Sequence, residues 1–371
     1  MDTIPVNEPL LDGNEKKYLC ECIDSGWISS EGPFVRELEE RFAARVGRRH
    51  GIALCNGSAA LEVAVASLGL GAGDEVILPA FTIISCAAAV VRAGAVPVLV
   101  DCDAATWNMD PDRIKDRITG RTKAVMAVHT YGLPVDMAPL QALADKYGLY
   151  VIEDAAEAHG LTCRGLPCGS FGNISTFSFY PNKLVTTGEG GMVLTDDETL
   201  AERCRSRRNL CFQSGRRFYH EELGWNYRLS NLQAAVGLAQ LERIEAFIDR
   251  KRRMGHRYRT LLEDIPGLQQ PLAATDWAEN IYWVYGLCLK DDVPFDAAGA
   301  MKRLGERGIG TRPFFWPIHE QPVFKHQGMF AGESHPISER LARRGFYIPS
   351  GLALTDAQMD RVAAALHEVM A

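Results

Sequence analysis

Short apolar runs alternate with helix-like segments along residues 50 to about 195, and this alternation limits the possible folds more than any other feature. The strand-like runs are Gly51–Leu54, Glu75–Leu78, Val96–Val100, Lys123–Val128 and Tyr150–Glu153. The helix-like segments between them are Ser58–Leu68, Thr82–Arg92 and Met137–Lys146. Because strands that alternate with helices are typical of βαβ units, we predict an α/β fold whose large, mostly parallel sheet carries helices on both faces.

The pattern changes in the second half of the chain. Two further strands, at 176–180 and 191–195, flank a loop, and a long helical stretch is expected from Leu229 to about Glu263. Beyond it we expect a strand over Tyr282–Leu289 and a helix over Ala297–Arg307. This order favours a large domain at 1–245, which includes the N-terminal segment, and a smaller C-terminal α+β domain at 246–371. No Gly/Ser-rich linker marks the boundary.

Composition narrows the classes of partner. The net charge is −7, and no Lys/Arg block is longer than three residues, so we expect no nucleic-acid and no membrane-surface partner. The charge-free stretch at 76–91 is shorter than the roughly 20 apolar residues of a membrane span, and the N-terminus lacks the pattern of a signal peptide. The ten cysteines include no C-x-x-C pair. We therefore expect a cytoplasmic protein with reduced thiols and no metal site.

One lysine stands out by its surroundings. Lys183 is the only lysine between Lys146 and Lys251, and it follows a strand-like run into a loop rich in Ser, Thr and Gly. A partly desolvated amine in such a loop is suited to Schiff-base chemistry with an aldehyde. Ser178 could offer a hydroxyl to a phosphate group. The alternative is an ordinary hairpin with an exposed lysine.

Two other motifs add an anion and a candidate phosphate site. Asp154 ends an apolar strand, where it could face a protonated pyridine nitrogen, and Glu157 and His159 follow it closely. Gly57 and Ser58 open a helix directly after a strand, a position that suits a phosphate. Each motif alone could be a helix cap. Together with Lys183 they predict one site for pyridoxal 5′-phosphate (PLP).

Several long motifs are similar to those of one enzyme family. They are Gly26-Trp-Ile-Ser-Ser, Asn56-Gly-Ser-Ala-Ala-Leu, Pro79-Ala-Phe-Thr, Glu153-Asp-Ala-Ala-Glu-Ala, Phe177-Ser-Phe-Tyr-Pro-Asn-Lys, Thr186-Thr-Gly-Glu-Gly-Gly and Gly224-Trp-Asn-Tyr-Arg-Leu-Ser-Asn. From about residue 5 to its end, the chain resembles the DegT/DnrJ/EryC1/StrS sugar aminotransferases. The resemblance implies the aspartate aminotransferase fold (fold type I), PLP as cofactor with pyridoxamine phosphate (PMP) in the half-reaction, and a homodimer with shared active sites.

Within the family, the chain looks most like 4-aminotransferases of the GDP-perosamine synthase type. That likeness implies amino transfer from glutamate to the C4 ketone of a nucleotide-linked 4-keto-6-deoxysugar. UDP- or dTDP-linked sugars and reaction at C3 stay open as alternatives. A sugar dehydratase on the same fold would carry histidine in place of Lys183. A nicotinamide oxidoreductase is disfavoured, because the glycines at 69–73 precede a strand instead of following one.

The resemblance also implies roles for individual residues. Lys183 would bond to PLP and transfer the proton, Asp154 would pair with the ring nitrogen, and Glu157 would approach the ring hydroxyl. Gly57, Ser58 and Ser178 would hold the phosphate, and Asn231 would reach the phosphate in the neighbouring subunit. The candidates near the nucleotide sugar are Trp27, Ser29, Arg228 and His319. Ile83 stands where relatives stack an aromatic ring on the cofactor, so either Ile83 packs on that ring or Phe81 compensates.

Overall fold

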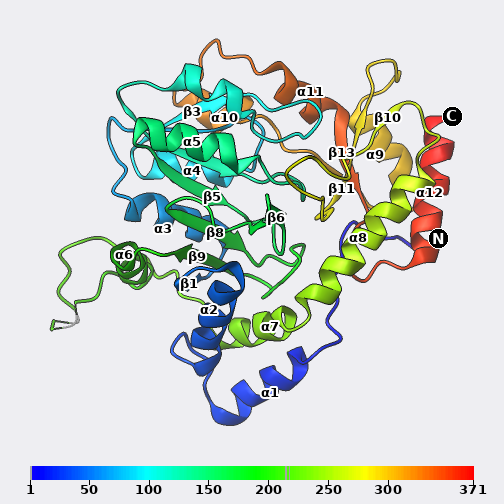
Figure 1. Cartoon of the computed structure of the whole chain (residues 1–371). Helices are drawn as coiled ribbons and strands as arrows, with labels where there is room; N and C mark the ends of the chain where they lie inside the picture. Colours follow the sequence, from blue (N-terminus) through cyan, green and yellow to red (C-terminus); the bar gives the residue numbers. More distant parts are fainter. Residues whose placement is uncertain (1, 214, 217) are drawn as a thin grey trace.

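A seven-stranded sheet forms the centre of the computed structural model, which describes residues 2–213, 215–216 and 218–371 (Figure 1). Its strands, in spatial order, are β1 (His50–Leu54), β9 (Gly191–Thr195), β8 (Ile174–Ser178), β5 (Tyr150–Asp154), β4 (Thr122–Val128), β2 (Glu75–Pro79) and β3 (Val96–Val100). The pairs from β8 to β3 are parallel, and β9 runs antiparallel to both of its neighbours. The predicted strands and the mostly parallel sheet are confirmed.

Helices cover both faces of this sheet because its strands are apolar on both sides. Within β2, Val76 and Leu78 join one core cluster and Ile77 joins the other. The first cluster packs under α3 (Gly57–Ser67), α4 (Ile84–Arg92) and α6 (Glu198–Arg208). The second packs under α2 (Pro33–Val46), α5 (Met137–Tyr147) and α7 (Asn231–Leu241). This is the burial on both faces that parallel sheets require.

A second, antiparallel sheet is built from the C-terminal part of the chain. Its order is β10 (Leu268–Gln269), β11 (Tyr285–Leu289), β13 (Gly345–Ile348) and β12 (Arg312–Pro313). Helices α8 (Ile244–Leu261), α9 (Ala297–Gly305) and α12 (Asp356–Met370) share a third core cluster with it. The shorter elements are α1 (Glu15–Ser25), α10 (Pro322–His326), α11 (Pro336–Arg344), β6 (Thr162–Cys163), β7 (Leu166–Pro167) and the 3-10 turns Pro111–Arg113, Lys115–Arg117 and Ile318–Glu320.

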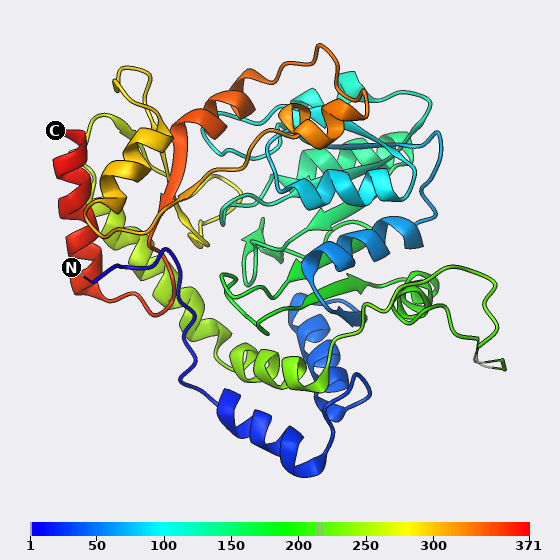
Figure 2. The same ribbon diagram turned by 180° about the vertical axis from the view of Figure 1, so that it is seen from behind.

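The N-terminal segment lies against this second sheet. Ile4 N–H donates to Gly308 O and Ile4 O accepts from Gly310 N–H, both at 2.8 Å, and the Ile4 side chain is buried in the third cluster. Figure 2 shows the blue N-terminal segment running beside α12. We still propose a division near residue 245, with residues 2–8 packing on the C-terminal unit.

The long helical stretch expected from Leu229 to about Glu263 is two helices, so that prediction is wrong in its continuity. Helix α7 ends at Leu241 and α8 begins at Ile244. Arg243 has φ −109° and ψ 5°, outside helical geometry. No Pro or Gly stands at the break, so the local sequence carries no signal for it. The change of direction lets α7 pack on the large sheet while α8 reaches the second one.

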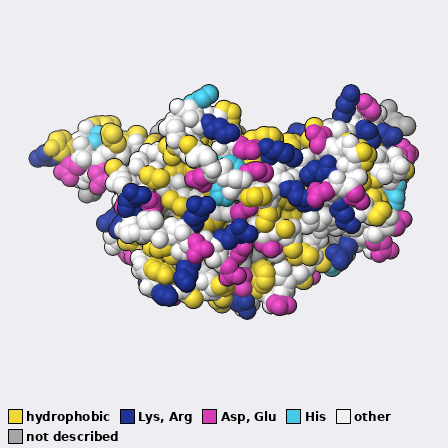
Figure 3. Space-filling view, turned by 90° about the horizontal axis from the view of Figure 1, so that it is seen from above, with side chains coloured by type: hydrophobic (Ala, Val, Ile, Leu, Met, Phe, Trp, Pro, Cys, Tyr) yellow, Lys and Arg dark blue, Asp and Glu magenta, His cyan; other side chains and the backbone are white. Residues whose placement is uncertain are grey.

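The expected strand over Tyr282–Leu289 begins only at Tyr285. Tyr282 has φ +53°, a left-handed conformation that no strand residue adopts. No helix within the part of the chain that the structure describes is both long and apolar enough to cross a membrane. On the face shown in Figure 3, acidic and basic side chains are interspersed.

Candidate active site

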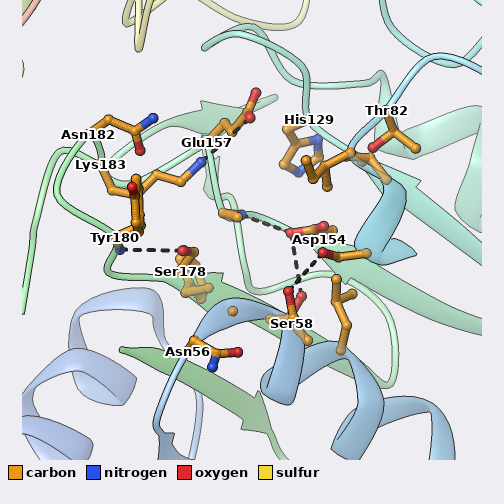
Figure 4. Close-up of a pocket in the computed structure, with 18 of the residues that line it drawn as sticks. Asn56, Ser58, Thr82, His129, Asp154, Glu157, Ser178, Tyr180, Asn182 and Lys183 are labelled. Carbon is orange, nitrogen blue, oxygen red and sulfur yellow. Dashed lines mark hydrogen bonds and ion pairs between the residues drawn. The ribbon is translucent and has the colours of Figure 1, made fainter. Parts of the chain in front are cut away.

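A cavity of about 500 Å³ opens at the carboxyl ends of β4, β5 and β8 (Figure 4). This is the edge where open α/β sheets bind their ligands. The N-terminus of α3 supplies one wall, with Asn56, Gly57 and Ser58. Trp283, Phe315 and Tyr347, from the C-terminal half of the chain, supply another. Residues from the large sheet and from the second sheet therefore contribute to one cavity.

Lys183 reaches into this cavity from the loop between β8 and β9. Its side chain is 10% exposed, and its Nζ lies 3.5 Å from Glu157 Oε1. The same Nζ lies 3.8 Å from the centroid of the Trp283 ring. Burial lowers the pKa of Lys183, while the carboxylates of Glu157 and Asp154 oppose that shift. The amine is thus desolvated and accessible from the cavity.

Asp154 ends β5 and lies across the cavity from Lys183 in Figure 4. Its Oδ1 accepts the Ala156 N–H at 3.1 Å, and its Oδ2 accepts the Cys86 S–H at 3.3 Å. Burial raises the pKa of this carboxyl group. A cation held against Asp154 would stabilise the carboxylate and reverse that shift. The site therefore favours a ligand that brings a protonated nitrogen.

Glu157 follows Asp154 by three residues and faces Lys183. Its Oε2 accepts the Tyr131 N–H at 2.8 Å. Burial raises the pKa of Glu157 to about 7. A carboxyl group with this pKa can either accept or donate a hydrogen bond near neutral pH.

The start of α3 forms the side of the cavity suited to an anion. Asn56 caps the helix by accepting the Ala59 N–H at 2.8 Å, and Ser58 Oγ lies 2.7 Å from Ser85 Oγ. A Cβ on Gly57 would lie 2.7 Å from Ser178 Cβ, so only glycine allows this close approach. Hydroxyl groups and unpaired amides of a first helical turn are suited to a phosphate.

These features fit PLP. The cavity offers a carboxylate for the ring nitrogen, an amine for the aldehyde and a helix N-terminus for the phosphate, each on a different wall. The fold and the cavity together define the class of PLP-dependent enzymes built on a mostly parallel sheet.

Comparison with known proteins specifies the class further. The model of the DegT/DnrJ/EryC1/StrS aminotransferase family matches residues 9–367. The chain is 42% identical to a GDP-perosamine synthase of Caulobacter vibrioides, over 99% of this chain and 98% of that protein. It is 39% identical to a GDP-perosamine synthase of Vibrio cholerae, over 97% of each. The crystal structure of DesI, determined in the presence of its TDP-sugar product, superposes with a TM-score of 0.90 at 34% identity, covering 100% of this chain and 93% of that one.

The chain therefore belongs to the DegT/DnrJ/EryC1/StrS aminotransferase family. It is a PLP-dependent sugar aminotransferase, which confirms the fold class, the enzyme class and the cofactor expected from the sequence.

The structure brings most of the predicted cofactor residues together. Among the residues that the structure describes, those lining the cavity include Gly57, Ser58, Ile83, Asp154, Glu157, Ser178 and Lys183. Ile83 is 40% exposed and precedes α4, whereas Phe81 is fully buried against Tyr131 and Phe315. Ile83, and not Phe81, is therefore the side chain available to a cofactor ring.

The remaining predicted residues do not line this cavity. Asn231 is 1% exposed, and its side chain bonds within the chain, to Phe34 N–H at 2.9 Å and Trp27 O at 2.6 Å. Ser29 is exposed, and its O accepts the Asn231 N–H. Arg228 bonds to the Asn209 side chain. The roles assigned to these residues stay predictions.

His319 also lies apart from the cavity. It is 4% exposed, and its Nε2 lies 3.0 Å from Glu339 Oε1. Together with Glu320, these residues line a separate cavity.

Several lining residues carried no signal that we used in the sequence. His129 directly follows β4, so its strand-end position could have indicated it. Ser85 lies two residues after Ile83 in a segment interpreted as helix, and Thr82 entered the sequence analysis only as the first residue of that segment and the last residue of the Pro79-Ala-Phe-Thr motif. Trp283 and Tyr347 lie 100 or more residues from Lys183 in the chain, and only the position of the second sheet brings them to the cavity.

Proposed function

We propose that this enzyme transfers an amino group from glutamate to the C4 ketone of a GDP-linked 4-keto-6-deoxysugar. The observation that carries the proposal is identity of 39–42% to GDP-perosamine synthases over nearly the whole of both chains. A TDP-linked sugar is the second candidate, because DesI, at 34% identity, was crystallised with a TDP-sugar product.

Each group of residues in the cavity has its own proposed role in the reaction. PLP, when bound, supplies an electron sink for the carbon that gains or loses the amine. Lys183 is proposed to attach the cofactor and to move the proton, because its Nζ is the lysine amine that lines the cavity within the described residues. Asp154 is proposed to hold the ring nitrogen in its protonated form. The α3 N-terminus and Ser178 are proposed to bind the phosphate, and Glu157 to bind the ring hydroxyl.

We also propose that the enzyme is a homodimer in which each active site contains residues of both subunits. After α6 the chain leaves the body of the molecule and returns to it at Arg228, which pairs with Leu54 (Figure 1). We call the described residues of this segment, 209–213, 215–216 and 218–228, the arm, and Phe218 and Leu223 on it are 84% and 91% exposed. We propose that the arm packs on a second copy of the chain. Asn226 is the exposed asparagine of this segment, whereas Asn231 is buried and bonded. Asn226 is thus better placed than Asn231 to reach a neighbouring cofactor phosphate.

We also propose a cytoplasmic location. All ten cysteines are free thiols, eight of them buried, as expected for a reducing compartment.

The deciding experiment is product analysis. Purified enzyme with PLP and glutamate is incubated separately with the GDP-, UDP- and dTDP-linked 4-keto-6-deoxysugars, and products are identified by mass and NMR. We expect an amine at C4 of the GDP sugar and ping-pong kinetics, since both substrates use one site in turn. An amine at C3, or no amination of any of the three, contradicts the proposal.

A further inference from the structure

Trp283 links the second sheet to the reactive lysine. Trp283 lies two residues before the start of β11, and its side chain lines the cavity. The centroid of its ring is 3.8 Å from Lys183 Nζ, well within the roughly 6 Å over which a cation interacts with an aromatic face. Trp283 as a whole is 5% exposed, so this contact is largely screened from water.

Trp283 is fixed at three points. Its indole N–H donates to Asn182 O at 2.7 Å, and Asn182 is the residue next to Lys183. Its ring stacks on Tyr131 with centroids 6.1 Å apart and planes at 23°. Its backbone O accepts from Lys251 Nζ at 2.8 Å. The indole therefore cannot turn away from Lys183 without breaking its contacts with Asn182 and Tyr131, while the Lys251 bond holds the backbone of Trp283 in place.

Lys251 is an unusual support for a backbone carbonyl. It lies in α8, is 3% exposed, and its Nζ donates to Ser350 O at 2.5 Å as well as to Trp283 O. Carbonyl groups are its hydrogen-bond acceptors among the described residues, and no carboxylate forms an ion pair with it there. Burial of an amine without an ion pair is costly. The two hydrogen bonds of Lys251 connect α8 to Trp283 and to the loop after β13.

We propose that the face of Trp283 holds the Lys183 ammonium whenever that amine is not bonded to the cofactor, and that Lys251 positions Trp283 for this purpose. The proposal rests on the function proposed for Lys183. In each half-reaction the substrate's nitrogen replaces the lysine, so a free amine must be kept in the cavity until it returns. Trp283 and Glu157 hold it from two sides (Figure 4 shows Glu157 beside Lys183).

The other ionisable groups that face Lys183 set its protonation together with Trp283. Glu157, Asp154 and Cys86 each favour the charged lysine. Burial, and to a smaller extent the charge of Lys183, lowers the pKa of His159 to about 3, so the imidazole is neutral at pH 7. Leucine at position 283 keeps an apolar side chain beside Lys183 and leaves these ionisable groups in place, while the attraction between the cation and the ring is lost.

The test measures the pKa of Lys183 in cofactor-free protein, so it does not depend on catalysis. The rate of acylation by acetic anhydride is followed by peptide mass mapping from pH 6 to 11, with exposed Lys290 as internal standard. For Trp283→Leu we expect the pKa of Lys183 to fall by ~0.5–1.5 units, the range that corresponds to one cation–π contact. Trp283→Phe keeps a ring and should recover most of the shift.

The result that overturns the proposal is an unchanged pKa of Lys183 in folded Trp283→Leu, or equal shifts in the Leu and Phe variants. Folding is checked by circular dichroism and by the melting temperature. If the Leu variant does not fold, the Phe and Tyr variants decide, since a ring without the indole N–H should preserve the pKa. A failed proposal for the sugar acceptor would leave this measurement unaffected.

Lys251 is tested by the same readout. Lys251→Met removes the donors to Trp283 O and Ser350 O, and we expect a downward pKa shift of Lys183 in the same direction as for Trp283→Leu. Lys251→Gln keeps N–H donors without charge and should restore part of the shift. Lys302→Met, at an exposed position in α9, is the matched control. A Lys251→Met protein that melts earlier but leaves the pKa of Lys183 unchanged would show Lys251 to be structural only.

Discussion

At the scale of single residues, the cavity places two carboxyl groups and one amine where water is scarce. Asp154 and Glu157 are 2% and 8% exposed, and the Lys183 side chain is 10% exposed. Burial alone disfavours all three charges. Their mutual attraction offsets this in part, and a bound cofactor with a cationic ring and an anionic phosphate would complete the pairing.

Replacing Lys183 tests the reaction most directly. Lys183→Ala should abolish transamination, because among the described residues no other lysine lines the cavity. Cofactor should remain bound only non-covalently, which mass spectrometry after borohydride reduction detects as an unmodified chain. Lys290→Ala, at an exposed position, is the control and should behave as wild type. Turnover of Lys183→Ala near the wild-type rate would refute the assignment.

Asp154→Asn should keep the fold and lower the rate by ~10²–10³, the usual effect of removing one preorganised electrostatic group. The amide can still accept the Ala156 N–H, so the local turn survives. Single-turnover kinetics with glutamate measure the effect. A decrease of less than about tenfold would mean that Asp154 serves mainly as a structural cap.

His159 predicts how stability depends on pH. Its Nδ1 accepts the Val185 N–H at 3.4 Å, and burial lowers its pKa from 6.5 to about 3. The unfolded chain therefore binds a proton below pH 6.5 that the folded chain does not bind until about pH 3. As the pH decreases from 6.5 to about 3, the free energy of unfolding should therefore decrease by up to ~1.4 kcal/mol for each pH unit.

Urea unfolding at pH 7, 6 and 5 measures this effect. In His159→Gln, which keeps an acceptor for Val185 and does not titrate, the decrease should be smaller by the contribution of the imidazole. Parallel pH profiles for the two proteins would disprove the assignment to His159.

At the scale of elements, the packing of α8 against Tyr282 requires a glycine at position 255. A Cβ at Gly255 would lie 2.1 Å from the ring of Tyr282, whose own φ is +53°. Gly255→Ala should therefore destabilise the protein by ~1–3 kcal/mol through overpacking. Gly305→Ala in α9 meets no atom within 4 Å and should be neutral or stabilising by ~0.5–1 kcal/mol. Chemical denaturation of both variants measures the contrast, and equal stabilities would contradict it.

The elements also show what local sequence can and cannot predict. Strand β9 was predicted at its observed limits, and α5 within one residue, because their apolar periodicity and flanking residues are local signals. The break between α7 and α8 was not predictable in this way, since periodicity continues through Glu242 and Arg243. Lys183 and Asp154 were found because each stands at a strand end or in a special loop. Trp283 was missed because its role arises only from tertiary contact.

At the scale of the whole molecule, the proposed homodimer with shared active sites predicts complementation between two inactive variants. In a mixed dimer of Lys183→Ala and Asn226→Ala, one site carries both defects and the other carries neither. Mixing after mild denaturation should therefore restore activity that neither variant has alone. Asn231→Ala, which unlocks a buried bonded side chain, should instead lower stability.

Light scattering gives the oligomeric state for the same samples. Mixed protein without recovered activity, or an active monomer, would exclude shared sites.

The N-terminal segment and the C-terminal helix α12 lie on the same side of the molecule, beside the second sheet (Figure 1). Residue 4 is bonded to residues 308 and 310, and Arg361 Nη1 in α12 donates to Asp2 O at 2.8 Å. A stretching force applied between the termini therefore acts first on these few bonds and on α12. The seven-stranded sheet and the cavity at its edge bear the load only after these bonds between the N-terminal segment and the C-terminal half of the chain have broken. The resistance of the molecule to stretching therefore depends first on these terminal hydrogen bonds, which lie away from the strand ends where the chemistry takes place.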